Sequence, residues 1–111
     1  MVEAIKQFFA KAMQDTIARK AGYICSNPDC QKYTLVPSPI DPNEMVYHGH
    51  GVMIYSPVPD HPRNSEEISV EYIGSSHNGL FLCFGCAYEV ESDQDGKFTV
   101  EMLLEWKGDS K

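Results

Sequence analysis

The chain has 111 residues, four cysteines and a formal net charge of −7. This length suits one domain with a modest hydrophobic core, to which a bound metal ion would add substantial stability. The negative charge argues against a domain that binds nucleic acid unaided, because Lys and Arg supply most of the affinity for phosphate. An acidic surface suggests that the chain binds a basic protein partner, that it mimics a nucleic acid, or simply that the surface is soluble.

No stretch of the sequence resembles a targeting or membrane segment. The chain lacks the apolar core of a signal peptide, and none of its apolar runs approaches the length of a membrane span. We therefore expect a cytoplasmic protein without membrane contact, in which cysteines stay reduced and available to a metal.

The first twenty residues carry the pattern of a helix. Apolar side chains recur at helical spacing over residues 2–21, and Gly22 follows a basic pair as a helix stop. We predict an amphipathic N-terminal helix over about residues 2–21. Its stripe is typical of core packing, but the neighbouring Phe8 and Phe9 cannot both face inward, so one of them is a candidate docking residue.

All four cysteines lie in two short knuckles, Cys25–Cys30 and Cys83–Cys86. Asn27-Pro28-Asp29 gives the first knuckle its turn chemistry, and Gly85 does the same for the second. Two pairs that use every cysteine of a reduced chain are typical of one structural zinc site. The predicted Zn²⁺ ligands are Cys25, Cys30, Cys83 and Cys86. Cysteines that are buried or paired without metal are the alternative.

Between the knuckles, the sequence alternates between proline-rich and strand-like segments. Three prolines over residues 36–43 exclude helix and favour an extended loop. Residues 44–55 predict a strand with two faces, and a second proline-rich loop covers residues 56–64. One face of this strand carries Gly49, Gly51 and Met53, and the other carries His48, His50, Val52 and Ile54.

Residues 65–73 fit two patterns, because Ile68, Val70 and Tyr72 alternate as in a strand whereas Ser65 before two glutamates is typical of a helix start. The elements after them are clearer. Residues 79–82 predict a short apolar strand that runs into the second knuckle, and residues 87–91 a short helix that leaves it. A turn follows over residues 93–96, and Thr99 caps a last helix over about residues 99–107.

Four segments stand in a distinctive order: Arg19…Gly22-Tyr23-Ile24-Cys25…Cys30, Gly49…Ile54-Tyr55-Ser56…Pro62-Arg63, Asn78-Gly79-Leu80-Phe81-Leu82-Cys83…Cys86, and Leu103…Trp106-Lys107. In this order, over about residues 15–107, the sequence resembles the zinc-containing HNH endonucleases. The resemblance implies one α+β domain over residues 1–111, with a zinc-enclosed treble-clef core over about residues 25–92 that contains a ββα unit. It also favours a helix in residues 65–73.

In that family, a histidine on the first strand of the ββα unit activates water, an asparagine orients the loop, and a histidine after the last zinc cysteine helps to hold a catalytic divalent ion. Matched residue by residue, the asparagine is Asn78, whereas the histidines fall on Met53 and Ala87. Methionine cannot accept a proton at neutral pH, and alanine offers a metal no ligand. A second ion, Mg²⁺ or Mn²⁺, would belong here only in an active nuclease.

Other polar residues are weaker candidates. His48 and His50 leave a regular strand on the face opposite Met53, so a bulge at one of the strand's glycines would be needed to redirect them; a solvated position is the alternative. His77 is a reserve base, and His61 is interpreted as a loop residue. Two charged residues have open roles: Arg63 could contact phosphate or pair with a local carboxylate, and Glu91 matches an acidic position of the family.

The leading hypothesis is a catalytically degenerate HNH-like protein that binds a protein partner, as an accessory or inhibitory subunit in bacterial or phage conflict, where the family is frequent. The alternative is an active metal-dependent HNH DNA endonuclease that uses His48, His50 or His77 and that an alanine introduced at position 87 silences. A zinc module that binds nucleic acid without cutting it is disfavoured by the negative charge.

Overall fold

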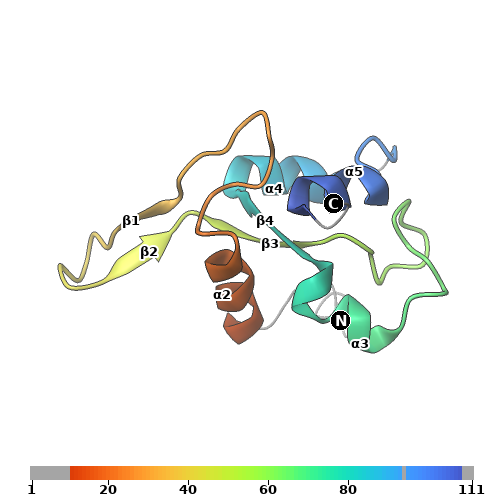
Figure 1. Ribbon diagram of the computed structural model, residues 1–111, viewed down its shortest axis with the longest axis horizontal. Helices are drawn as coiled ribbons and strands as arrows, with labels where there is room; N and C mark the ends of the chain where they lie inside the picture. The colour runs from red at the N-terminus through yellow and green to blue at the C-terminus, as the bar shows by residue number, and fades with distance from the viewer. Residues whose placement is uncertain (1–10, 94, 109–111) are drawn as a thin grey trace.

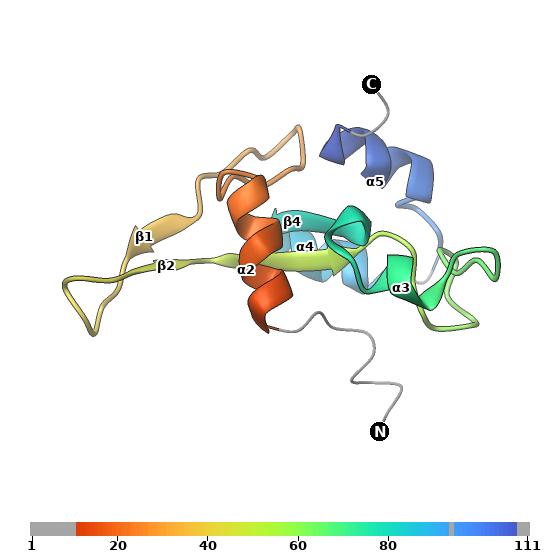
Figure 2. The ribbon, with the colours of Figure 1, turned by 60° about the horizontal axis from the view of Figure 1, so that its bottom comes forward.

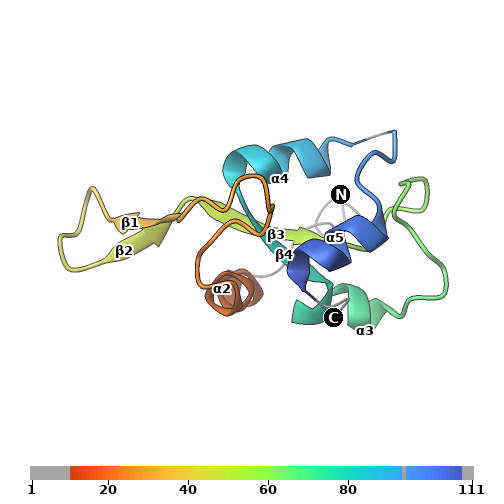
Figure 3. The ribbon, with the colours of Figure 1, turned by 45° about the horizontal axis from the view of Figure 1, so that its top comes forward.

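The computed structural model describes residues 11–93 and 95–108. At its centre, β3 (Gly49–Met53) and β4 (Gly79–Cys83) form an antiparallel pair (Figure 1). Helix α2 (Lys11–Lys20) covers one face of this pair and α4 (Phe84–Glu91) the other, as Figures 2 and 3 show. The chain is therefore a small α+β fold whose central strands are packed on both sides.

The two faces of β3 bury different sets of side chains, as the strand pattern predicted. Met53 and Phe81 join Ile17 of α2 on one face. On the other face lies the larger core, in which the strands meet α4 and the final helix, α5 (Val100–Lys107). Its buried members are Cys25, Val52, Ile54, Leu80, Leu82, Cys83, Ala87, Val90 and Leu103.

A second antiparallel pair, β1 (Leu35–Pro37) with β2 (Met45–Tyr47), forms an arm that projects from the central strands (Figure 1). The predicted strand over residues 44–55 is therefore two strands. They are separated at His48, whose N–H donates to the carbonyl of Thr34 at 3.1 Å. Residues 36–43 were predicted to form an extended loop, but Val36 and Pro37 belong to β1. A proline is tolerated there because β1 lies at the edge of its sheet.

The first helix ends where the sequence predicted. Gly22 adopts a φ of 65°, and the following Tyr23 is also left-handed, at 61°, with its N–H donating to the carbonyl of Ala18 at 3.0 Å. This hydrogen bond and the two left-handed residues close the last turn of α2. The earlier part of the predicted helix, including Phe8 and Phe9, lies outside the described residues.

The helix within residues 65–73 is shorter than predicted and has a different cap. It spans only Val70–Ile73 (α3), and the Ser69 hydroxyl accepts from the N–H of Tyr72 at 3.1 Å. Ser65 instead accepts from the N–H of Glu67 and closes a local turn. A short 3₁₀ turn, η1 (Ser76–Asn78), then leads into β4.

The last predicted helices are confirmed, although α4 begins at Phe84 rather than at residue 87. The Thr99 hydroxyl caps α5 by accepting from the N–H of Met102 at 3.1 Å. Across residues 11–93 and 95–108, every helix is too short or too polar to cross a bilayer.

The close approach of α2 depends on glycines in the central strands. A Cβ at Gly51 would lie 2.9 Å from Cδ1 of Ile17, and a Cβ at Gly79 would overlap the same atom. We expect Gly79→Ala to lower the free energy of unfolding by about 1–3 kcal/mol, because Ile17 must leave its position. Gly74→Ala is the matched control, since its nearest neighbour would be 3.9 Å away. Equal urea midpoints for the two variants would contradict this packing.

Candidate metal centre and the adjoining pocket

The four cysteines come together where the first knuckle meets the junction of β4 and α4. Their Sγ atoms all lie within 4.8 Å of one another, and those of Cys30 and Cys83 are 3.9 Å apart. Tetrahedral zinc with Zn–S bonds of about 2.3 Å holds its sulfurs about 3.8 Å apart. The spacing and the soft thiol ligands therefore fit a metal ion such as zinc.

Backbone geometry holds the first knuckle in shape. The Asn27 carbonyl accepts from the N–H groups of both Cys30 and Gln31, at 2.9 and 3.0 Å, while the Asn27 side chain accepts from Asp29 N–H at 2.9 Å. Gln31 closes this turn in a left-handed conformation with φ of 52°. The N–H of Ser26 donates to Phe81 in β4 at 2.9 Å, so the knuckle is fixed to the central strands.

The thiols differ in their tendency to ionise. Burial raises the pKa of Cys25 and of Cys86. Burial opposes ionisation of Cys83 as well, but hydrogen bonds from the N–H of Cys86 and from neighbouring thiols outweigh it and lower the pKa of Cys83 to about 7. A divalent ion entering this group would displace the remaining protons, so its affinity must fall as the pH falls.

A pocket of about 120 Å³ lies at the end of β3. Met53, which the resemblance to HNH endonucleases would match to the general base, lines this pocket and packs against the α2 side of the strands. Ala87, which the same resemblance would match to the metal-binding histidine, is fully buried in the core on the opposite side. The full lining is Val52, Met53, Ser56, Pro57, His61, Arg63 and Glu91.

Asn78, the third residue that the resemblance singled out, is fully buried and forms three side-chain hydrogen bonds. Its Oδ1 accepts from the N–H of Tyr55 at 2.7 Å, and its Nδ2 donates to the carbonyls of Tyr55 and Ile73 at 3.0 and 2.9 Å. These bonds tie the segment after β3 to the end of α3. Asn78 therefore orients the loop beside the pocket.

The reserve histidines lie elsewhere, and none of them lines the pocket. His50 pairs with Glu91 of α4 at 3.1 Å, and its ring centroid lies 5.9 Å from that of Phe84. His48 stacks on Phe84, with centroids 6.1 Å apart, and His77 stacks on Tyr72. The bulge that would redirect the strand histidines is not found, because β3 pairs with β4 without a break in register over Gly49–Met53.

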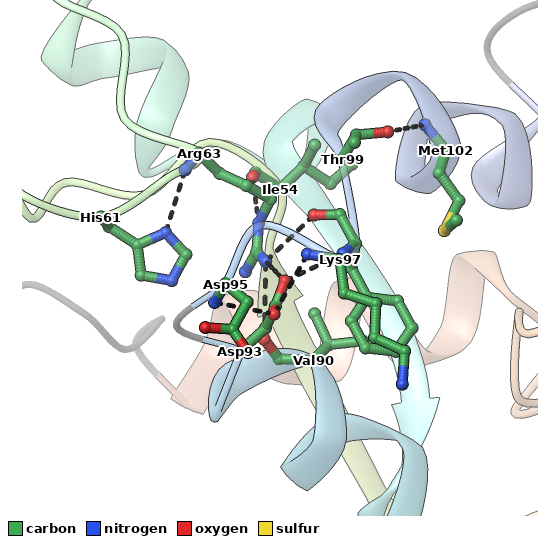
Figure 4. Close-up of polar contacts among 10 residues, drawn as sticks. Ile54, His61, Arg63, Val90, Asp93, Asp95, Lys97, Thr99 and Met102 are labelled. Carbon is green, nitrogen blue, oxygen red and sulfur yellow. Dashed lines mark hydrogen bonds and ion pairs between the residues drawn. The ribbon is translucent and has the colours of Figure 1, made fainter.

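His61, which the sequence analysis placed in a loop, is the histidine that lines the Met53 pocket. Its Nδ1 accepts from the N–H of Arg63 at 3.0 Å (Figure 4). Burial, followed by the nearby Arg63 guanidinium, lowers the pKa of His61 and favours the neutral ring. Because Nδ1 accepts, the neutral ring carries its proton on Nε2. Its position directly before the family-like Pro62-Arg63 pair was the available sequence signal.

Arg63 is only 4% exposed, and its charge is used within the fold. Its Nε donates to the carbonyl of Ile54 at 2.9 Å, and its Nη1 lies 4.0 Å from an Asp93 carboxylate oxygen (Figure 4). Further bonds reach the carbonyls of Val90 and Phe98. Of its two predicted roles, pairing with a local carboxylate is the one that the structure contains.

Comparison with known proteins gives no relative: no family model matches the sequence, and neither a curated protein nor a solved structure matches the chain. The chemistry of the site therefore follows from its own residues. Within residues 11–93 and 95–108, the four thiols are the only group of three or more His, Cys, Asp or Glu side chains placed to share an ion.

Proposed function

We propose that this chain is a zinc-stabilised, HNH-like protein that has lost catalysis and acts by binding, as an accessory or inhibitory subunit in bacterial or phage conflict. Three features support the family assignment. The strands β3 and β4 pair with each other and α4 directly follows β4, although α3 and η1 stand between the two strands in the sequence. The four thiols lie at the junction of β4 and α4, and Asn78 fastens the adjoining loop.

The observation that carries the loss of catalysis is the setting of Met53 and Ala87. Both side chains are buried and apolar, and each packs into a different core cluster. Hydrolysis of a phosphodiester needs an activated water and a metal that neutralises charge on phosphate. Neither side chain supplies a base or a ligand, so the proposed role is binding.

One specific observation supports a second candidate function, an active nuclease. His61 lines the same pocket as Met53 and Glu91, and burial lowers its pKa, which favours the neutral ring that a general base needs. The two candidates differ in a single measurable property, which is cleavage of DNA in the presence of a divalent metal.

Supercoiled plasmid incubated with the protein and Mg²⁺, Mn²⁺ or Ni²⁺ should show no metal-dependent nicking, because the part of the chain that the structure describes has no group of three or more His, Cys, Asp or Glu ligands besides the four thiols. His61→Ala, His50→Ala and His77→Ala are the matched variants. Nicking by the unaltered chain that one of them abolishes would replace the binding role with a nuclease. If Ala87→His alone restores cleavage, position 87 silences an otherwise active enzyme.

The binding role has its own test. A tagged copy expressed in the native host should recover one protein in a stoichiometric complex. A solitary monomer under the same conditions would argue against an accessory subunit, and recovery must be compared with that of a Cys83→Ser control, in which the four-thiol site is lost.

A further inference from the structure

Among the helices and strands of residues 11–93 and 95–108, none covers the outer side of α4 (Figure 3). Two aromatic side chains stand on it, Phe84 at 52% and Tyr88 at 72% exposure. They are four residues apart, so they are neighbours on the helix surface. Glu89 and Glu91 flank them, and both are exposed. We call these four residues, Phe84, Tyr88, Glu89 and Glu91, the α4 face.

The α4 face is anchored to the strand beneath it. The Phe84 ring stacks on His48 with an interplanar angle of 25°, and Glu91 pairs with His50 at 3.1 Å. Phe84 N–H also donates to the carbonyl of His48 at 3.3 Å. The aromatic pair is therefore held on a prepared support, which reduces the ordering that binding would require.

The segment that carries the α4 face is strongly acidic, with one exposed lysine, Lys32 or Lys97, just beyond each of its ends. The segment 33–96, which supplies both strand pairs and α4, contains ten acidic residues and a single basic one, Arg63. Because Arg63 is buried, this segment exposes no lysine or arginine. The basic residues of the described part of α2 lie beyond the opposite face of β3 and β4. Four thiolates on Zn²⁺ would make the α4 side more negative still.

We propose that the α4 face binds an arginine- or lysine-rich segment of a protein partner; this rests on the binding role proposed above and names its surface. A cationic side chain placed over the Tyr88 ring gains a cation–π contact, and the exposed Glu89 and Glu91 give this side of α4 a negative charge that attracts it. The same field repels phosphate, and two copies of a chain with charge −7 repel each other. A basic segment is therefore the complementary occupant.

The probe is a fluorescein-labelled synthetic peptide of alternating arginine and leucine, measured by fluorescence anisotropy against the zinc-loaded, full-length chain. We expect Tyr88→Ser to weaken binding about threefold and Glu89→Lys about tenfold. Val70→Ser, at an 82% exposed site on α3, and Glu66→Lys, which makes the same charge change elsewhere, are the matched controls and should weaken it less than about twofold.

Equal losses in the test and control variants would mean that net charge alone attracts the peptide, and would overturn the proposal. So would tighter binding of a DNA duplex at the same salt, or dimerisation that Tyr88→Ser abolishes. If the host pull-down recovers a partner that the Tyr88→Ser and Glu89→Lys variants still bind, the assignment of the binding surface to the α4 face is wrong, while the binding role stands. Plasmid nicking would remove the binding role whatever the peptide does.

Discussion

Cys83→Ser is expected to abolish metal binding and the cooperative unfolding transition. Cys83 lies where β4 meets α4, its Sγ is 3.9 Å from that of Cys30, and it belongs to the larger core. Structural zinc contributes about 10–16 kcal/mol in small peptides, which is comparable to the whole stability of a typical domain. Removing one of four ligands should therefore leave the chain largely unfolded.

The measurement is metal content per chain together with thermal unfolding followed by circular dichroism. Ser26→Ala is the matched control, because it alters a knuckle neighbour and keeps all four thiols. A strong chelator should unfold the unaltered chain, and added Zn²⁺ should restore it. Less than about half a metal ion per carefully prepared chain, or an unchanged transition in Cys83→Ser, would refute the zinc centre.

The parts of the fold that could be predicted are those set by local chemistry. Two cysteine knuckles, the left-handed Gly22 and the Thr99 cap each depend on residues within a few positions of one another, and the structure contains all three. The two-faced character of β3 was also predictable, because alternation is a property of any extended strand.

The remaining features depend on contacts between distant segments. Ser65 and Ser69 both precede acidic residues, so local sequence does not decide which of them caps α3. The break at His48 depends on Thr34, which belongs to the segment before β1. His61 reaches the Met53 pocket because the loop folds back on β3, and its one sequence signal, the position before Pro62-Arg63, does not specify that contact.

Asp93→Ala is expected to lower the free energy of unfolding by about 3–5 kcal/mol, because it leaves the buried Arg63 guanidinium without its carboxylate. The substitution also removes three hydrogen bonds in which the carboxylate accepts from backbone N–H groups, the shortest from Phe98 at 2.8 Å. Asp95→Ala, at an exposed side chain in the same turn, should cost less than about 0.5 kcal/mol. Urea unfolding compares the two variants, and equal losses of unfolding free energy would contradict the stabilising role of the Asp93 carboxylate.

The Asp93 carboxylate also predicts how the unfolding free energy changes at acid pH. Burial opposes ionisation of Asp93, but the bonds from Phe98, Lys97 and Asp95 N–H and the charge of Arg63 outweigh it and lower its pKa below the usual value of 3.8. Its stabilising contribution is therefore complete above about pH 4 and is lost as the pH falls through the lowered pKa. Asp93→Asn keeps an acceptor oxygen and no charge, so its unfolding free energy should fall less steeply below pH 4 than that of Asp95→Ala. Because both variants retain the four cysteines, protonation of the thiolates affects them equally, and parallel acid curves would contradict a lowered pKa of Asp93 in the folded chain.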